Sequence, residues 1–375
     1  MGSELERKLA FLEQDPTNAN LLADIADNYI RLGEFTQAQA YIDQGLSINN
    51  QHLALQFVQS TLALALNDPD TAIALLKTLK KNNSAEAVIY NLAYAYMLKG
   101  KPEKAKFELL AIIDLPQLMP SAWLLFARVC HHLGEMDEAK EAAEKYIEQC
   151  PSDPEGVGVL AFIKVDMQAE DAEEWADKAL VIDANNVEAL LTQGSIALNE
   201  VNLSKAVPHF EKAVSVKPSS GRAHAGLGLI HMANNDLQSA RQSLETAVIN
   251  MPNHIGTWHA LAWSQILMDD LNAAKESFDK ANTIDRNFGE TYGGLAVIAV
   301  MQGQLDKAKG LIRKAFGLNS RSFAARYAQT LIITKTGGAK GNEKALVMID
   351  KILDSKVGQG ASSLKELLIQ LQQKR

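Results

Sequence analysis

The stretch LLTQGSIALNEVNLSKAVPHFEKAVSVKP, residues 190–218, decides the fold of this 375-residue chain. In its first ten residues apolar side chains recur at i, i+3, i+4 and i+7 around Gly194, which is the spacing of an amphipathic helix. Twelve residues later comes Ala206, on a second apolar segment that must stop near Pro218, since proline has no amide hydrogen to donate. The stretch predicts two short helices that pack closely at these two small residues.

The same arrangement returns along the chain. Small residues recur every 33 or 34 residues, and we call this series the first-helix ladder: Ala26, Ser60, Ala93, Ala127, Ala161, Gly194, Gly228, Ala262, Ala296 and Thr330. An alanine follows twelve residues later in most cases, which gives the second-helix ladder: Ala38, Ala72, Ala105, Ala139, Ala172, Ala206, Ala240, Ala274, Ala308 and Ala345. Because helix axes approach to about 8 Å only where the side chain between them is small, the ladders predict ten helix pairs.

Turn-forming residues separate the two helices of most pairs: Gly33, Asn67, Gly100, Gly134, Asn235, Gly303 and Gly337. Two units show the pattern of bulky, small and aromatic residues most fully, with Leu190, Gly194, Ala206, Phe210, Ala213 and Pro218 in one and Trp258, Leu261, Ala262, Ala274, Phe278 and Ala281 in the other. From residue 19 to about residue 354 the chain resembles the tetratricopeptide repeat family, whose unit has 34 residues. The resemblance implies an all-α fold, a right-handed superhelical α-solenoid of tandem helix-turn-helix repeats.

The ladders also divide the chain into segments. We predict a leading helix and connection over residues 1–18, four repeats over 19–153, an irregular fifth repeat with a possible bend over 154–186, and five repeats over 187–356. The fifth repeat is irregular because its ladder spacing falls to eleven and its turn has no glycine. In the tenth repeat the spacing grows, which predicts a loop insertion over 335–344. A linker and a C-terminal capping helix are predicted over 357–375, where a capping-box pattern precedes apolar residues.

Composition favours a folded protein in a reducing compartment. Apolar residues make up 47% of the chain and charged residues 22%, which predicts a well-filled core rather than disorder. The two cysteines lack the spacing of a disulfide framework or a metal knuckle. The charged N-terminus has no apolar core of signal-peptide length, and no run of about 18 apolar residues occurs. We expect a cytoplasmic protein without direct membrane insertion, or a periplasmic or membrane-anchored one if an N-terminal signal has been removed.

Charge is unevenly distributed. The net charge of −8 argues against a general nucleic-acid binder. Residues 131–190 carry 16 acidic and 4 basic residues, net −12, whereas residues 305–375 carry 5 acidic and 14 basic residues, net +9. The chain is therefore expected to have an acidic middle and a basic C-terminal end, which are either solvated helix faces or docking surfaces.

No constellation of residues predicts catalysis or a bound metal. Adjacent His131 and His132 point about 100° apart on a helix, and the other histidines that share a face, His224 and His231, lack an evident carboxylate partner. The stretch TGGAKGN, residues 336–342, has glycines and a lysine but not the phosphate-binding pattern. Cys130 stands where the family has a buried tyrosine, so it is predicted to pack in the core. We expect a non-enzymatic protein with no cofactor and no metal.

The first helix of each repeat lines the concave face in this family, by resemblance. We place the lining side chains three residues before and one residue after each member of the first-helix ladder. The resulting candidates for a partner-binding groove are Phe57, Tyr90, Tyr94, Leu124, Arg128, Leu191, Leu229, His259, Trp263 and Tyr327. The same rule turns Gly293 and Val297 inward. Exposed aromatic side chains mark binding sites, although these could instead fold into neighbouring helices and complete the core.

Three tyrosines fall within seven residues, and the same rule assigns two of them to the groove and one to the core. Tyr90 and Tyr94 flank Ala93 on the predicted inward face, whereas Tyr96 occupies the family's buried tyrosine position. Two specialised sites of the family are not matched: Ala23, Asp27, Phe57 and Thr61 replace the cations and amides of the clamp that holds chaperone tails, and the asparagine ladder of the O-linked N-acetylglucosamine transferase arm is missing.

The sequence thus favours a scaffold or adaptor that binds an extended or helical segment of a partner protein in an apolar, aromatic-lined concave groove. Its partners are expected to be proteins or peptides. The alternative is a structural or self-associating component of a secretion, pilus or polysaccharide-export machine, a homo-oligomer that uses the acidic middle and the basic C-terminal end.

Overall fold

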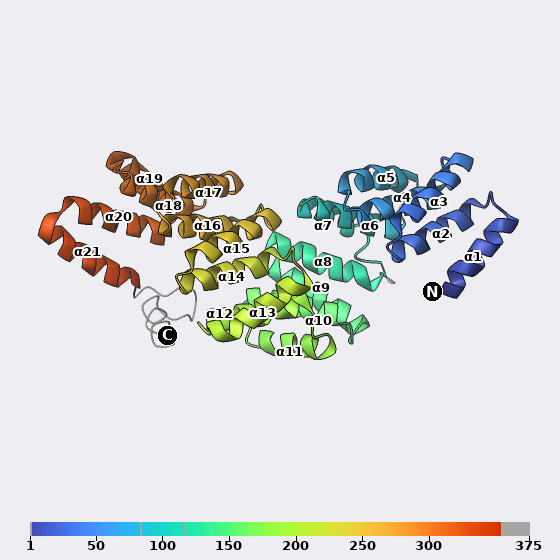
Figure 1. The fold of residues 1–375 in the computed structure, drawn as a ribbon, viewed down its shortest axis with the longest axis horizontal. Helices are drawn as coiled ribbons and strands as arrows, with labels where there is room; N and C mark the ends of the chain where they lie inside the picture. The colour runs from blue at the N-terminus through green and yellow to red at the C-terminus, as the bar shows by residue number, and fades with distance from the viewer. Residues whose placement is uncertain (1, 83–84, 116–117, 354–375) are drawn as a thin grey trace. The chain divides into compact units, whose positions relative to one another are not determined.

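The computed structural model describes residues 2–82, 85–115 and 118–353. Over these ranges the chain forms helices and no strand, so the all-α fold is confirmed. The contacts divide the chain into two units, which we describe separately: unit 1 is Met1–Asp171 and unit 2 is Ala172–Arg375. The division falls between the two helices of the fifth repeat. In each unit successive helix pairs stack side by side, as in an α-solenoid (Figure 1).

Unit 1 holds the leading helix, four complete pairs and the first helix of the fifth. Its helices are α1 (Gly2–Gln14), α2 (Ala19–Arg31), α3 (Phe35–Ile48), α4 (Leu53–Ala65), α5 (Pro69–Asn82), α6 (Glu86–Leu98), α7 (Pro102–Leu109), α8 (Pro120–Leu133), α9 (Met136–Gln149) and α10 (Pro154–Asp166). From α2 onward, even-numbered helices are the first of each pair. Helix α7 has 8 residues, against 14 in α3, α5 and α9, so its repeat has a short second helix.

Unit 2 continues the same alternation. Its helices are α11 (Ala172–Ile182), α12 (Val187–Asn199), α13 (Leu203–Val216), α14 (Gly221–Ala233), α15 (Leu237–Asn250), α16 (Ile255–Leu267), α17 (Leu271–Ile284), α18 (Gly289–Met301), α19 (Leu305–Leu318), α20 (Phe323–Thr336) and α21 (Gly338–Leu353). No helix of the described ranges is long and apolar enough to cross a membrane.

Both ladders lie in the core. Ala26, Ser60, Ala93, Ala127 and Ala161 are inaccessible to solvent, and nine of the ten second-helix alanines are at most 2% exposed. Tyr96 and Cys130 are also buried, as predicted. The small side chains let large neighbours fill the remaining space. Interior packing of this density leaves little room for added atoms, so the ladder residues set the distance between helices.

The turn within each pair depends on one residue in the left-handed region. Seven residues after each of the first nine members of the first-helix ladder, φ lies between 57° and 77°. Glycine or asparagine occupies six of these positions, and Gln168, Val201 and Asp269 occupy the other three. The turn geometry is therefore kept even where a side chain makes it unfavourable. In the tenth repeat the left-handed residue is Gly338 and not Gly337, because α20 continues one residue further.

The predicted loop over residues 335–344 is wrong. Helix α20 ends at Thr336 and α21 begins at Gly338, so most of the inserted residues lengthen the last helix at its N-terminus, to 16 residues. Ala345 is still buried within it. The signal that suggested a loop, two glycines followed by polar residues, is also compatible with one tight turn and the start of a helix. The predicted linker and capping helix lie outside the described residues.

A glutamate in the first turn of a first helix accepts hydrogen bonds from backbone N–H groups at the start of the first helix of the next repeat. Glu290 of α18 accepts hydrogen bonds from the backbone N–H groups of Phe323 and Ala324, at 2.9 and 3.0 Å. These N–H groups open α20 and have no partner within their own helix. In unit 1, Glu86 of α6 accepts in the same way from the Met119 N–H group, just before α8. Each carboxylate also complements the positive end of the helix it binds.

Gly294 gives the tightest test of close packing. A methyl group added there would collide with the ring of Phe278, which is fully buried. Gly310 of α19 is also helical, but a methyl group there would contact nothing. Gly310→Ala should therefore stabilise the chain by about 0.5–1 kcal/mol through helix propensity alone.

Gly294→Ala should instead lower the stability of α17 and α18 by about 1–2 kcal/mol, since overpacking outweighs the same gain in propensity. Amide hydrogen exchange of these helices measures the opening free energy locally, which suits a repeat protein that does not unfold in one step. Equal changes in the two variants would contradict this account of the packing.

Candidate functional site

Four of the predicted groove residues lie on three successive first helices of unit 1. We call Phe57 of α4, Tyr90 and Tyr94 of α6 and Arg128 of α8 the unit 1 aromatic surface. Phe57 and Tyr90 are partly exposed, and Tyr94 is 40% exposed. Electrostatic coupling joins Tyr90 to both Tyr94 and Arg128, so these three side chains are close neighbours. The Asn91 amide donates to Thr61 Oγ1 at 3.4 Å, which ties α6 to α4.

Polar groups fix the orientation of this surface. Burial raises the pKa of Tyr90, and the Tyr90 hydroxyl also hydrogen-bonds Ser121 on α8. Arg128 donates from Nη1 to Glu155 Oε1 of α10 at 2.8 Å. Ser121 and Glu155 were not among the predicted residues. Both stand six residues before a member of the first-helix ladder, one helical turn before the inward position that the rule did include, so one further turn of the rule finds them.

Three other predicted residues have different environments. Leu124 and Leu191 are only 5% and 7% exposed, so their side chains pack between helices and offer little surface to a partner. They drop out of the candidate site. The spacing rule predicts which side of the helix these leucines lie on. It does not predict whether side chains of neighbouring helices cover them. Leu229 of α14 is 42% exposed and remains a candidate in unit 2.

The aromatic residues predicted for unit 2 pack against one another. His259 and Trp263 of α16 both contact the buried ring of Phe278 edge-on, with ring centroids 5.0 and 6.2 Å apart. The Trp263 ring also meets Tyr327 of α20 at 6.2 Å. A second edge contact joins His259 to Phe288 at 5.2 Å. The unit 2 aromatic cluster therefore spans α16 to α20 and adds to the core, although Trp263 and Tyr327 keep part of their surface exposed.

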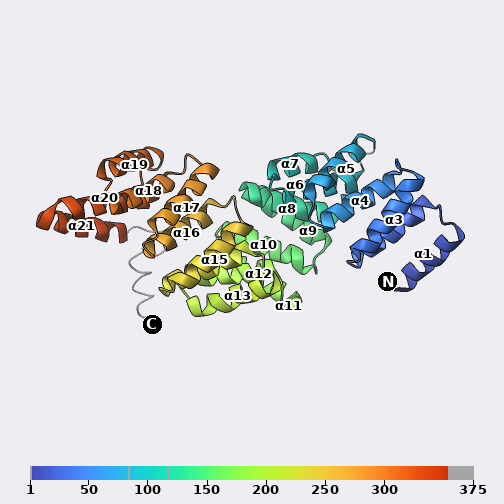
Figure 2. The same ribbon diagram turned by 45° about the horizontal axis from the view of Figure 1, so that its top comes forward.

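Helix α20 packs against α18 and covers part of the first-helix face of unit 2. Gly293 lies where α18 meets α20, and a Cβ on it would approach the Ala325 nitrogen to 2.6 Å. Val297, one turn later, is completely buried and shares a core cluster with Ala328 of α20. Figure 2 shows α20 running beside α18. The predicted inward positions of α18 are thus covered by the next first helix and are not free to bind a partner.

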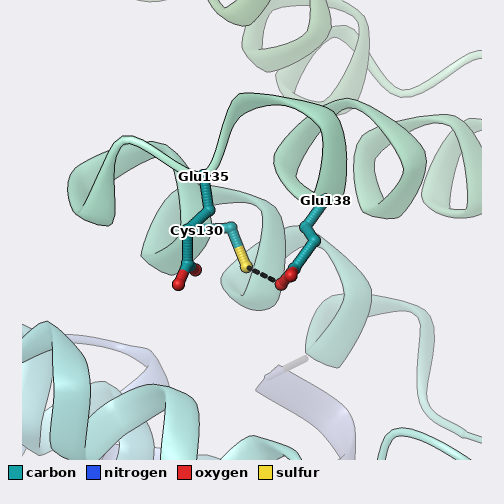
Figure 3. A group of neighbouring side chains, drawn as sticks. All are labelled: Cys130, Glu135 and Glu138. Carbon is teal, nitrogen blue, oxygen red and sulfur yellow. Dashed lines mark hydrogen bonds between the residues drawn. The ribbon is translucent and has the colours of Figure 1, made fainter.

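One group of side chains has the composition of a metal site. Cys130 Sγ and carboxylate oxygens of Glu135 and Glu138 lie within 4.8 Å of one another (Figure 3). However, the Lys106 ammonium binds both carboxylates, at 2.8 and 2.5 Å. Burial raises the pKa of Cys130 to about 12, and its thiol donates to Glu138. A metal would require the thiolate and the removal of Lys106, so this group is an ion-pair cluster that joins α7 to α9.

A cavity of about 350 Å3 lies between α1 and α2, away from these residues. Its walls are polar, and they are formed by Glu4, Leu5, Lys8, Asp24, Asp27, Asn28, Arg31 and Leu32. Arg31 pairs with Asp27 at 2.8 Å, and Lys8 pairs with Glu4 at 3.3 Å. The charges in this cavity are thus largely neutralised by neighbours on the same helix.

The burial of His259 generates a prediction about pH. Burial lowers the pKa of His259 to about 4, and its Nε2 lies 2.8 Å from Thr291 Oγ1. The folded protein therefore resists protonation that the unfolded chain accepts near pH 6.5. Stability should fall as pH drops from about 6.5 toward 4, by on the order of 2 kcal/mol for this residue. His259→Gln should remove that part of the pH dependence, as measured by the opening free energies of α16 and α18 from amide hydrogen exchange of both proteins at pH 7 and pH 4.5. An unchanged difference between the two pH values would contradict the assignment.

Solved structures show the same fold over most of the chain. Human IFIT1, solved as a dimer with m7Gppp-AAAA, is 14% identical, with 98% of this chain and 92% of that chain covered at a TM-score of 0.59. A monomeric IFIT1 mutant with Gppp-AAAA is 13% identical, with 95% and 89% covered at a TM-score of 0.60. Identities this low indicate a shared fold alone. Among curated proteins, none matches the chain.

Family models match the repeats themselves. Two models described as tetratricopeptide repeat match residues 23–87, 191–255 and 255–288. The model for anaphase-promoting complex, cyclosome, subunit 3 matches residues 69–146. These matches fall in both units and follow the helix pairs of the structure. The chain is a tetratricopeptide-repeat protein.

Proposed function

We propose that this protein is a non-enzymatic scaffold or adaptor that binds an extended or helical segment of a partner protein on the unit 1 aromatic surface. One observation carries the proposal. Partly exposed aromatic side chains stand on two successive first helices, α4 and α6, beside an arginine on the third, α8. Aromatic residues and arginine are the side chains that most often dominate protein interfaces.

The arrangement suits a peptide better than a small molecule. Phe57 and Tyr94 offer apolar area, while the Tyr90 hydroxyl and the Arg128–Glu155 pair lie beside them as polar groups that a peptide backbone can contact. Tyr90 is already held by Ser121, so little ordering is needed when a partner binds. Burial of two or three such anchors is consistent with binding in the micromolar range, on the order of −8 kcal/mol.

Unit 2 plays a smaller part in this proposal. Its aromatic residues contact each other, and α20 covers the corresponding face of α18. Trp263 and Leu229 keep exposed surface, so α16 and α14 offer a second, smaller candidate surface within unit 2. We therefore expect the larger share of binding energy to come from unit 1.

A peptide library displayed on phage and selected against the whole chain provides ligands for the test. For the selected peptides, Tyr94→Ala should weaken binding about tenfold or more, because truncation of an interface anchor removes at least about 1.4 kcal/mol. Ile249→Ala is the matched control, since Ile249 is 76% exposed at the end of α15 and far in sequence from the surface. Calorimetry gives both affinities.

Tyr90→Phe refines the same test. This variant keeps the ring and removes the hydroxyl that bonds Ser121, so it should change affinity less than Tyr94→Ala does. If Tyr94→Ala and Ile249→Ala bind every selected peptide as tightly as the unaltered chain, the unit 1 aromatic surface is not the binding site.

The second candidate function is assembly through oppositely charged surfaces. Helix α9 has five acidic residues and two lysines, net −3, whereas α19 has four basic residues and one aspartate, net +3. Contact between α9 of one copy and α19 of the next would build a head-to-tail assembly, which is a closed ring or an open filament.

Such an assembly should dissociate at high salt, because contacts between exposed charges are screened. Sedimentation at low and high salt measures this directly. Replacing two exposed bases of α19, by Lys307→Glu with Arg313→Glu, should abolish the assembly at low salt. A mass that changes with neither salt nor these substitutions would exclude this function.

A further inference from the structure

The second helix of the third repeat has two large exposed apolar side chains at positions where every other repeat has a charged residue at one or both. Phe107 of α7 is 72% exposed, the most exposed aromatic side chain in the described ranges, and Leu110 beside it is 50% exposed. They stand two and five residues after Ala105 of the second-helix ladder. The equivalent pairs in the other repeats are Ala40 and Asp43, Ala74 and Lys77, Glu141 and Glu144, Glu174 and Asp177, Pro208 and Glu211, Gln242 and Glu245, Glu276 and Asp279, Gly310 and Arg313, and Val347 and Asp350.

No other repeat therefore presents two large apolar side chains at these positions. The two are also one helical turn apart, so they form a contiguous patch, which we call the convex patch. It is separate from the unit 1 aromatic surface, which lies on first helices, because α7 is a second helix. Contiguous exposed apolar surface on a folded protein marks an interaction site.

The helices on either side of the convex patch carry opposite charge. Ion pairs fix their order, since Lys80 of α5 binds Glu108 of α7 at 2.5 Å and Lys106 of α7 binds Glu138 of α9 at 2.5 Å. Helix α5 has three lysines and one aspartate, net +2, and α9 is net −3. The patch thus has a basic flank on one side and an acidic flank on the other.

The opposite charges also occupy equivalent positions along the two flanking helices, counted from the ladder alanine of each helix. Lys77 and Lys81 lie five and nine residues after Ala72 of the second-helix ladder. Glu144 and Glu148 lie five and nine residues after Ala139. Both lysines and Glu148 are exposed, and the Glu144 side chain is 45% exposed. Equivalent positions in the two flanking helices therefore carry opposite charges.

We infer that the convex patch is the centre of a symmetric interface with a second copy of this chain. A two-fold axis parallel to α7 exchanges the two flanks and leaves the height along the helices unchanged. It places Lys77 opposite Glu144 of the second copy and Lys81 opposite Glu148, with Phe107 and Leu110 of both copies buried between them. A two-fold axis perpendicular to α7 in the plane of the interface would instead place α5 opposite α5 and α9 opposite α9. Like charges would then face each other, which disfavours this arrangement. The apolar centre supplies the affinity and the flanks select the orientation.

Sedimentation equilibrium of the full chain tests this, up to about 100 µM, where a weak interface still assembles. The chain should approach twice its monomer mass as concentration rises. Phe107→Glu should raise the dissociation constant about 30-fold or more, since it places a charge in the apolar centre. Phe11→Glu is the matched control, because Phe11 is also an exposed phenylalanine of unit 1, 52% exposed, and lies on α1, which packs on α2 and not on α5, α7 or α9. Circular dichroism verifies that both variants stay folded.

Charge reversal tests the orientation of the two copies. Lys77→Glu with Lys81→Glu should weaken the dimer, and the further addition of Glu144→Lys with Glu148→Lys should restore it, because complementarity then returns with reversed sign. Lys307→Glu with Arg313→Glu in α19 should leave this dimer unchanged, whereas it abolishes a charge-driven assembly through α9 and α19.

The proposal is overturned if the chain remains a monomer at the highest concentration, or if Phe107→Glu associates as strongly as Phe11→Glu. A third outcome is a chain that stays monomeric and binds a phage-selected peptide that the Phe107→Glu variant no longer binds. That result would show that the convex patch binds another protein and not a second copy. Peptide binding by Tyr94 is measured separately, so failure of the dimer leaves the unit 1 aromatic surface untouched.

Discussion

Close approach of helix backbones at small side chains is the constraint on which the rest of the structure depends. The ladder residues are buried in every repeat of the described ranges, and large side chains from the partner helix fill the space that they leave. Gly294 shows the limit, because Phe278 occupies the position that a methyl group would need. Once this distance is fixed, the direction of every other side chain on the first helix follows. The ladder thus sets both the core and the candidate binding face.

Two further devices connect the helices, the first within each pair and the second between one pair and the next. A single left-handed residue turns the chain between helices, and Val201 and Gln168 adopt this conformation although neither is glycine. First-turn glutamates then bind the N–H groups of the following first helix, as Glu290 does for α20. The same device links α6 to α8 in unit 1, where Tyr94 stays exposed. What differs in unit 2 is Gly293, whose missing side chain lets α20 approach α18 closely, and Val297 is buried there.

The same repeat plan gives the first-helix aromatic residues different surroundings in the two units. In unit 1 the tyrosines of α6 keep exposed surface and are oriented by polar partners from α8 and α10. In unit 2 the ring of Trp263 packs on Phe278 and Tyr327. The outer face differs as well, because the short helix α7 presents Phe107 between oppositely charged neighbours. Binding of a peptide and association of two copies would therefore use opposite faces of unit 1.

The sequence by itself determined the fold, since a 34-residue period of small residues leaves a stack of helix pairs as the arrangement that buries them. It also identified Tyr96 as core, and it predicted that Tyr90 and Tyr94 face inward, because helical spacing gives direction. Only the tertiary structure decided which side chains are exposed. Exposure depends on side chains from other helices, and helical spacing gives no information about those. Leu124 is buried by them, Gly293 is covered by α20, and His259 is enclosed by Phe278 and Phe288. The tenth repeat differed from its prediction because glycines at residues 337 and 338 are compatible with either a loop or a tight turn, and the structure has the turn, with α21 beginning at Gly338.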